Sequence, residues 1–336
     1  MTGLFADART SFKPRILAAA ALLAAAICGA PGEAAAQADY PNKPIRMVVP
    51  FPPGESLDAV ARTIAEPWGR LLGQNFVVDN KPGAGGMIGT DFVAKSAPDG
   101  YTILMGNVGG LAIIPAIKSD VPYNVSKDLT PISQVASVPF FLFVGASQPF
   151  QSVQDIIDYA KQNPGKINYA STGIGSGVHL AGELFKSQTQ IDIVHVPYKG
   201  VSQALPDIIS GGIQMVFYPV TFAPQVKAGQ LRALVVTAPK RIAALPDVKT
   251  SAEIGMPDLI ASSWHMVLAP GGTPQPIIDK LSKTLLQVLA DPAIQAKLAN
   301  LGAETVASTP AEAKVFLDAE LAKWRAVAKS SNITMN

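Results

Sequence analysis

Residues 171–177, STGIGSG, combine hydroxyl side chains with glycines, and His179 follows closely behind them. Serine and histidine are two parts of a hydrolytic triad, so Ser176 and His179 are candidates for an exported serine hydrolase. The nucleophile elbow of such enzymes is G-x-S-x-G, whereas the sequence here is GIGSG. The other chemistry open to this segment is anion binding, because hydroxyls and helix-start N–H groups can donate to a carboxylate. A third interpretation is that Ser176 only caps a helix.

A second candidate site follows the apolar run Ile45–Val49, which is typical of a buried strand. Residues 50–54, PFPPG, can continue neither a strand nor a helix. Ser56 is then predicted to cap a helix that runs through residues 59–72. The free N–H groups of that helix favour an anion. Glu55 and Asp58 stand at its N-terminus, where acids are favourable even without a ligand, and this is the default interpretation of Asp58.

The glycine-rich segment GAGGMIG at 83–89 can be compared with the dinucleotide fingerprint, which needs glycine at its first, third and sixth positions. The sixth position is Ile88, and no acidic residue ends a following strand to hold a ribose. The segment instead predicts a loop whose small residues Gly83, Ala84 and Gly85 let backbone N–H groups approach a ligand, or a plain tight turn. No cofactor is expected.

The three histidines, His179, His195 and His265, lack the spacing and neighbouring acids of a metal site, so no metal is expected. His195 alternates with valines and fits a strand, whereas His265 could face a cleft. Lys199 lies in a loop before a helix, where it could pair with a carboxylate or simply hold the loop. The candidate apolar walls are Phe51, Tyr198, Tyr218 and Trp264, each of which could also belong to the core.

Short strands, loops and helices alternate along most of the chain, which predicts parallel sheets with helices on their faces. The expected strands are Ile45–Val49, 75–78, 101–105, 168–170, 193–196, 215–217 and 231–236, with helices over 59–72, 87–95, 154–161, 178–187 and 203–210. The runs 135–144 and 263–268 are expected to cross between two domains. Helices over 275–290, 292–301 and 310–329 are expected to pack on the first domain. The predicted fold class is an α/β two-lobed clamshell with two crossings. In this organisation, residues 37–140 plus 264–336 form lobe 1, and residues 141–263 form lobe 2.

The N-terminal residues have the pattern of a secretory signal peptide, with a basic start, an apolar run and a small-residue cleavage site. Cleavage near Ala36 or Ala38 would remove Cys28, the single cysteine, and leave no thiol for a disulfide or metal site. The formal net charge of +2 over 336 residues argues against nucleic-acid binding. We expect an exported protein in the periplasm.

Several long motifs together resemble one family. They are YPNKPIRMVVPFPPG at 40–54, NKPGAGGMIGTDFVAKSAPDGYTILMG at 80–106, INYASTGIGSGVHLAGELFK at 167–186, VPYKG at 196–200, ISGGIQMVF at 209–217 and WHMVLAPGGTP at 264–274. In these motifs the chain resembles the periplasmic substrate-binding proteins of tripartite tricarboxylate transporters, the Bug family. The resemblance implies a clamshell that closes on a small carboxylate and delivers it to a membrane permease, with no catalytic residue.

In that family the carboxylate is held mainly by loop backbone, hydroxyls and ordered waters. The implied contacts are Phe51, Gly54, Glu55, Ser56, Asp58, Gly83, Ala84, Gly85 and Asn107 in lobe 1, with Ser171, Thr172, Gly175, Ser176, His179, Tyr198 and Lys199 in lobe 2. Tyr218 and Trp264 complete the expected ligand-binding set.

Two positions depart from the family pattern. Glu55 replaces a usual glycine after PPG, and Tyr218 stands where an aspartate is common. Glu55 would repel a dianion and would suit a ligand with an amine or a ring nitrogen, and Tyr218 would suit a flat ligand. The expected molecule is therefore a monomeric solute-binding protein for an organic, aromatic or amino acid. The alternatives are the serine hydrolase and a ligand-sensing partner of a membrane receptor.

Overall fold

The computed structural model describes residues 2, 40–198, 200–330 and 333–334, and residues 43–336 form one compact unit. The predicted signal peptide and its cleavage site lie outside the described residues, apart from Thr2. Lys199 lies outside them as well. Among the described residues, no helix has both the length and the apolar character needed to span a membrane.

The first half of the unit is built on three parallel strands. β1 (Ile45–Val49) lies between β2 (Phe76–Asn80) and β3 (Thr102–Asn107). The connections carry α3 (Ser56–Leu72), the turn η1 (Ala84–Gly86) and α4 (Met87–Ala94). After β3 come a π-helical turn η2 (Gly109–Ile113), α5 (Ile114–Ile117) and α6 (Val125–Asp128).

A second group of parallel strands follows along the chain. β5 (Ile167–Ser171) lies between β6 (Ile193–Pro197) and β7 (Met215–Pro219). The helices of this part are α7 (Val153–Gln162), α8 (Gly177–Thr189), α9 (Val201–Ser210) and α10 (Ala223–Lys227), with the short turn η3 (Val220–Phe222) before α10. β8 (Leu231–Val236) and the turn η4 (Ala252–Ile254) complete it.

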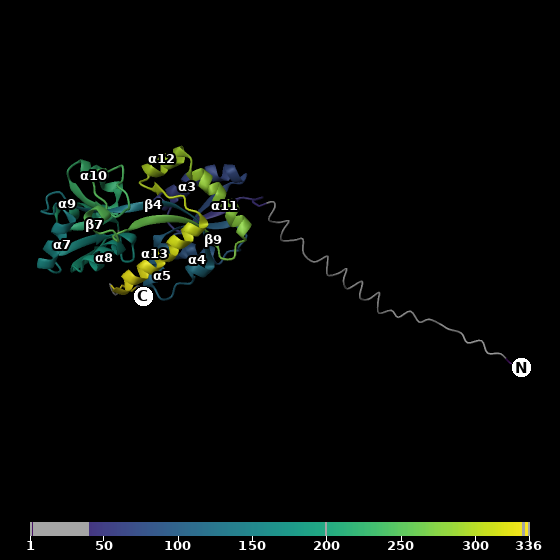
Figure 1. Ribbon diagram of the computed structural model, residues 1–336, viewed down its shortest axis with the longest axis horizontal. Helices are drawn as coiled ribbons and strands as arrows, with labels where there is room; N and C mark the ends of the chain where they lie inside the picture. Colours follow the sequence, from purple (N-terminus) through teal and green to yellow (C-terminus); the bar gives the residue numbers. More distant parts are fainter. Residues whose placement is uncertain (1, 3–39, 199, 331–332, 335–336) are drawn as a thin grey trace. The chain divides into compact units, whose positions relative to one another are not determined.

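One long strand, β4 (Leu129–Gly145), takes part in both groups. Its residues 129–139 pair antiparallel with β9 (Ser262–Pro270), which in turn pairs with β3. Its residues 140–145 pair antiparallel with β7 and β8. The strand order β2-β1-β3-β9-β4-β7-β5-β6 is therefore continuous, and Figure 1 shows β4 and β9 running between the two groups.

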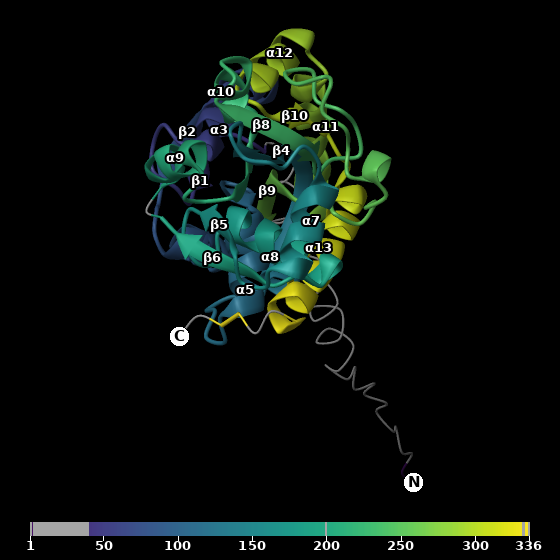
Figure 2. The same cartoon turned by 90° about the vertical axis from the view of Figure 1, so that its left-hand side faces the viewer.

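The last part of the chain is helical, as expected, apart from the two-residue strand β10 (Glu304–Thr305), which pairs with β4. α11 (Gln275–Leu289) and α12 (Pro292–Asn300) contact α3. α13 (Pro310–Ser330), yellow in Figures 1 and 2, contacts α5 and also α8 in the second group. α13 therefore packs on the first group and also reaches the second.

The contact between α13 and β9 is made through indole groups. Trp264 and Trp324 are both buried, and both indole N–H groups donate to Oε2 of the buried Glu320, at 2.6 and 2.9 Å. Phe316 packs edge-on against Trp264, with the ring centroids 5.4 Å apart. Trp264 is thus committed to the interface of β9 with α13.

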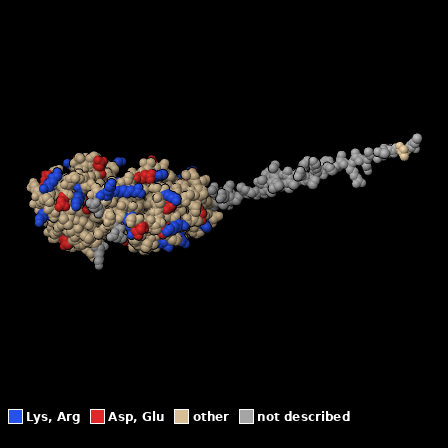
Figure 3. Space-filling model, turned by 90° about the horizontal axis from the view of Figure 1, so that it is seen from below, with Lys and Arg blue, Asp and Glu red and all other residues tan. Residues whose placement is uncertain are grey.

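The surface carries no large region of one charge in the view of Figure 3. Among the described residues on that face, Lys and Arg are interspersed with Asp and Glu. This distribution agrees with the small formal net charge of +2.

Candidate functional site

The carboxyl ends of the parallel strands and the starts of α3 and α8 surround a cavity of about 490 Å³. This is the size of an ordinary small-molecule site. The lining comes from residues on both groups of strands. It comprises Phe51, Glu55, Ser56, Leu57, Ala84, Gly85, Asn107, Val108, Gly109, Ile114, Phe140, Thr172, Ile174, Gly175, Ser176, Gly177, Val178, Tyr218, Pro219, Ser263 and His265.

On the α3 side, the loop that carries Phe51 and Glu55 is held by Asp58. The Asp58 carboxylate accepts hydrogen bonds from the Gly54 N–H and the Arg62 Nε–H, both at 2.9 Å, and from Asn80 Nδ2, also at 2.9 Å. Burial raises the pKa of Asp58, but the hydrogen bonds from Arg62, Gly54 and Asn80 outweigh it and lower the pKa. Asp58 therefore fixes the loop and is only 2% exposed.

The start of α3 differs in detail from the sequence prediction. The N-cap residue is Glu55, with no side-chain capping bond, and Ser56 is already the first helical residue. The prediction of Ser56 as the cap was wrong by one position, because the PFPPG turn ends earlier than the propensity of serine suggests. The first N–H groups of α3 have no partner within the helix, and Ser56 and Leu57 lie at the cavity.

Two glycine-rich turns complete this side. Gly86 has φ +98°, and a Cβ there would meet the Phe51 ring at 3.2 Å, so glycine lets the turn approach that ring. After β3, Asn107 Oδ1 accepts the N–H of Gly110, the second residue of the π-helical turn, at 3.3 Å. Such turns are frequent at functional sites.

On the other side, the loop between β5 and α8 is tied down by its own side chains. Ser176 caps α8 by accepting the His179 N–H at 3.2 Å. The Gly175 N–H donates to His179 Nδ1 at 3.1 Å. Ser171 Oγ accepts the Gly173 N–H at 3.0 Å and lies 2.5 Å from His195 Nε2. The loop presents Thr172, Ser176 and the N–H groups at the start of α8 to the cavity.

Behind this loop lies a buried cluster of titratable groups. The rings of His179 and His195 stack with centroids 3.9 Å apart, and the Tyr169 hydroxyl donates to Glu183 at 2.5 Å. Burial and then the neighbouring His195 lower the pKa of His179 to about 4. Burial also lowers the pKa of His195. Both rings are therefore neutral at pH 7.

The geometry does not join Ser176 and His179 as a nucleophile and its base. Ser176 Oγ is engaged by the backbone N–H of His179, while the ring nitrogen Nδ1 accepts from Gly175. The serine that does approach a histidine ring is Ser171, whose side chain is buried.

The structure brings together ten of the residues proposed from the sequence. Phe51, Glu55, Ser56, Ala84, Gly85, Asn107, Thr172, Gly175, Ser176 and Tyr218 all line the cavity. Gly54, Asp58, Gly83, Ser171, His179, Tyr198 and Trp264 do not line it, and Lys199 is outside the described residues. The Tyr198 hydroxyl instead donates to Asp207 at 2.7 Å.

Several lining residues were not proposed from the sequence. Val108, Gly109 and Ile114 belong to the turn after Asn107, for which only the paired glycines 109–110 gave a signal. Phe140 and Ser263 come from β4 and β9, whose apolar runs look like core. His265 lines the cavity, as the sequence allowed, but it is 1% exposed and its Nδ1 has no partner among the described residues. Burial lowers its pKa to about 4.

Three comparisons relate the chain to known proteins. Residues 60–333 match the family described as "Tripartite tricarboxylate transporter family receptor". The chain is 37% identical over 294 residues to Protein BugT of Bordetella pertussis, and the match covers 87% of this chain and 90% of BugT. It also matches the structure of periplasmic binding protein BugD, with TM-score 0.71 and 34% identity over 88% of this chain and 100% of that one.

A further solved structure was determined with a ligand. It is R. palustris Rpa4515 with adipate, which has TM-score 0.74 and 37% identity and covers 88% of this chain and 99% of that one. The chain described here therefore has the α/β periplasmic binding protein fold and belongs to the family of tripartite tricarboxylate transporter receptors, which are binding proteins and not enzymes.

Proposed function

We propose that this receptor holds a small carboxylate in the cavity and presents it to the permease subunits of a tripartite tricarboxylate transporter. The observation that carries the proposal is that the starts of two long helices, α3 and α8, line one cavity. Unpaired N–H groups and the helix dipole favour an anion at the start of a helix. At α3 the N-cap residue Glu55 already supplies a negative charge, so the start of α8 is the one open to an anionic ligand. The match to a receptor family and to a relative determined with adipate supports the same ligand class.

We place the ligand carboxylate at the start of α8, because Thr172, Ser176, Gly177 and Val178 line the cavity there. Two of them carry hydroxyls and the other two supply backbone N–H groups as donors. The opposite wall carries Glu55, a less favourable place for an anion. Lys199 follows Tyr198 in the loop after β6 and is a further proposed contact.

The two groups of strands act as two lobes, residues 37–140 with 264–336 and residues 141–263. The runs 135–144 in β4 and 263–268 in β9 are the two crossings, and the lobes close around the ligand by a hinge motion. The protein is exported as a monomer after cleavage near Ala36 or Ala38. A ligand-sensing role at a membrane receptor would use the same closed form and is the alternative output.

A thermal-shift screen of residues 37–336, first unfolded and refolded to remove any carried ligand, tests the proposal. The panel holds adipate, citrate, benzoate, aspartate and nicotinate. A ligand at a hundredfold excess over Kd should stabilise the protein by about 2.7 kcal/mol. A refolded protein that shows no shift with any carboxylate would refute carboxylate binding.

A further inference from the structure

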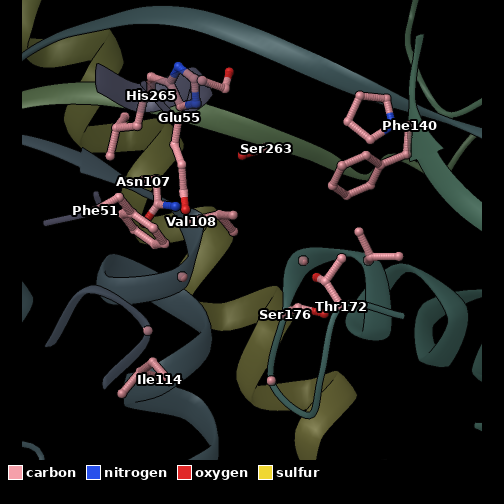
Figure 4. A pocket seen from close by; sticks show the side chains of 18 of the residues that line it. Phe51, Glu55, Asn107, Val108, Ile114, Phe140, Thr172, Ser176, Ser263 and His265 are labelled. Atoms are coloured by element: carbon pink, nitrogen blue, oxygen red, sulfur yellow. The ribbon is translucent and has the colours of Figure 1, made fainter. Parts of the chain in front are cut away.

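The formal charge of the cavity wall bears on which carboxylates the cavity can bind. Among its described lining residues, Glu55 is the one with a formal charge at pH 7, because His265 is buried with a pKa near 4 and no Lys or Arg is present. Figure 4 shows the Glu55 side chain reaching past His265 toward Asn107.

The Glu55 carboxylate acts across the cavity. Burial raises the pKa of Tyr218, and the negative charge of Glu55 raises it further. Burial also raises the pKa of Glu55 itself. Arg62, the described cation nearest to it in the sequence, is engaged with Asp58 and Asn80. The carboxylate at the cavity thus has no cationic partner among the described residues.

The remaining walls suit a cation as well. Phe51, Phe140 and Tyr218 bring aromatic rings to the same cavity, and the negative faces of such rings attract cations. Tyr218 itself packs on Phe222, with the centroids 4.8 Å apart, which limits its movement. In Figure 4, Thr172 and Ser176 stand on the opposite side from Glu55.

We propose that the ligand is a zwitterion whose carboxylate lies at the start of α8 and whose cationic nitrogen faces Glu55, rather than a dicarboxylate. This inference rests on the proposed carboxylate function of the same cavity. The cationic group is an ammonium or a charged ring nitrogen. A second carboxylate in its place would face the negative charge of Glu55, which already acts on Tyr218, and would be repelled.

Two ligand pairs of matched shape test the inference by titration calorimetry. 5-Aminopentanoate carries an ammonium where adipate carries its second carboxylate. Trigonelline, an N-methylpyridinium carboxylate, carries a ring cation where 3-methylbenzoate is neutral. The cationic member of at least one pair should bind at least tenfold more tightly than its partner.

Glu55→Gln should reduce that preference at least tenfold and should improve adipate binding. Glu66→Gln is the matched control, because Glu66 lies on α3, which Glu55 precedes, but pairs with Arg70 at the exposed surface. This control should change neither the preference for the cationic ligand nor the affinity for adipate. Tighter binding of adipate and 3-methylbenzoate by the unaltered protein, or an unchanged preference in Glu55→Gln, would overturn the inference and leave the carboxylate function standing. Binding of no compound in either pair or in the carboxylate panel would overturn both.

Discussion

The Gly175 N–H donates to Nδ1 of His179 at 3.1 Å, so a buried imidazole fixes the backbone of the loop that lines the cavity. A ring nitrogen can accept this hydrogen bond only when it carries no proton. The proton of the neutral ring is therefore on Nε2, which lies 3.9 Å from Glu183. His179 acts on the site through the loop rather than by touching its contents.

The first prediction concerns this hydrogen bond. His179→Leu should leave the buried Gly175 N–H without an acceptor and cost about 1–3 kcal/mol of stability. His179→Asn offers an oxygen close to the position of Nδ1 and should recover part of that loss. Hydrogen exchange at the Gly175 amide should be fast in His179→Leu and slower in His179→Asn. Equal exchange in the two variants would show that the ring does not hold the loop.

The second prediction concerns pH. The folded-state pKa values of His179 and His265, both about 4, lie below the value near 6.5 of an unfolded chain. The unfolded chain therefore binds more protons between pH 6.5 and 4, so the free energy of unfolding should fall as the pH falls through that window. Each histidine contributes up to about 1.4 kcal/mol per pH unit.

Urea unfolding of the protein and of His265→Leu across pH 7 to 4 measures this effect. In a plot of the free energy of unfolding against pH, the slope of the variant should be smaller by the contribution of one histidine. The carboxylates contribute equally to the slopes of both proteins. Parallel curves would mean that His265 is not held neutral by burial.

The third prediction uses two carboxylates of α3 that are both paired with an arginine four residues further on. Asp58 is buried and also binds Gly54 and Asn80, whereas Glu66 is exposed and pairs with Arg70. Asp58→Ala should cost about 2 kcal/mol in urea unfolding, because it removes several partly buried hydrogen bonds. Glu66→Ala should cost less than about 1 kcal/mol. Similar losses for both would show that the buried network adds nothing beyond the ion pair.

Local signals in the sequence were sufficient for most of the elements. The predicted strands Ile45–Val49 and 231–236 have the bounds of β1 and β8, because an apolar run between turn residues is a local property. β4 is longer than the predicted 135–144 because its first residues pair with β9, which lies far away in the sequence. The π-helical turn after Asn107 was missed because its geometry depends on packing rather than on periodicity.

The candidate site was harder to predict, because residue type does not reveal which way a side chain points. The loops after β1, β2, β3 and β5 were located from their Gly, Pro and Ser content, and they do meet at one cavity. Asp58, Ser171 and His179 were grouped with the ligand contacts, yet each holds a loop from behind. Phe140 and His265 come from long apolar strands, in which single cavity-facing positions look like core.

The fourth prediction tests which N–H groups hold the proposed carboxylate. Gly177 is the first residue of α8, where proline is tolerated, and Ser176 before it has the extended backbone that proline requires. Gly177→Pro removes the N–H, whereas Gly177→Ala retains it. Both add a Cβ about 3.3 Å from the Phe140 ring, so the alanine variant controls for crowding.

The proline variant should bind the carboxylate identified in the screen roughly tenfold more weakly than the alanine variant, the cost of one hydrogen bond to a charged group. Calorimetry on the two variants measures the difference. Equal affinities would place the carboxylate away from the Gly177 N–H.

The last prediction separates a structural tryptophan from a binding one. Trp264 was proposed as a wall of the site, but its indole N–H is bound to Glu320 and its ring packs against Phe316 of α13. Trp264→Phe should lower the free energy of unfolding by about 2 kcal/mol, since it loses buried ring volume and a buried hydrogen bond. Because Trp264 does not line the cavity, the affinity for the carboxylate found in the screen should stay within about twofold. The affinity of Trp264→Phe is compared with that of Tyr218→Phe. The second variant loses a hydroxyl from a residue that lines the cavity and keeps the volume of the ring. A large loss of affinity in Trp264→Phe with unchanged stability would return Trp264 to the site and remove it from the interface between β9 and α13.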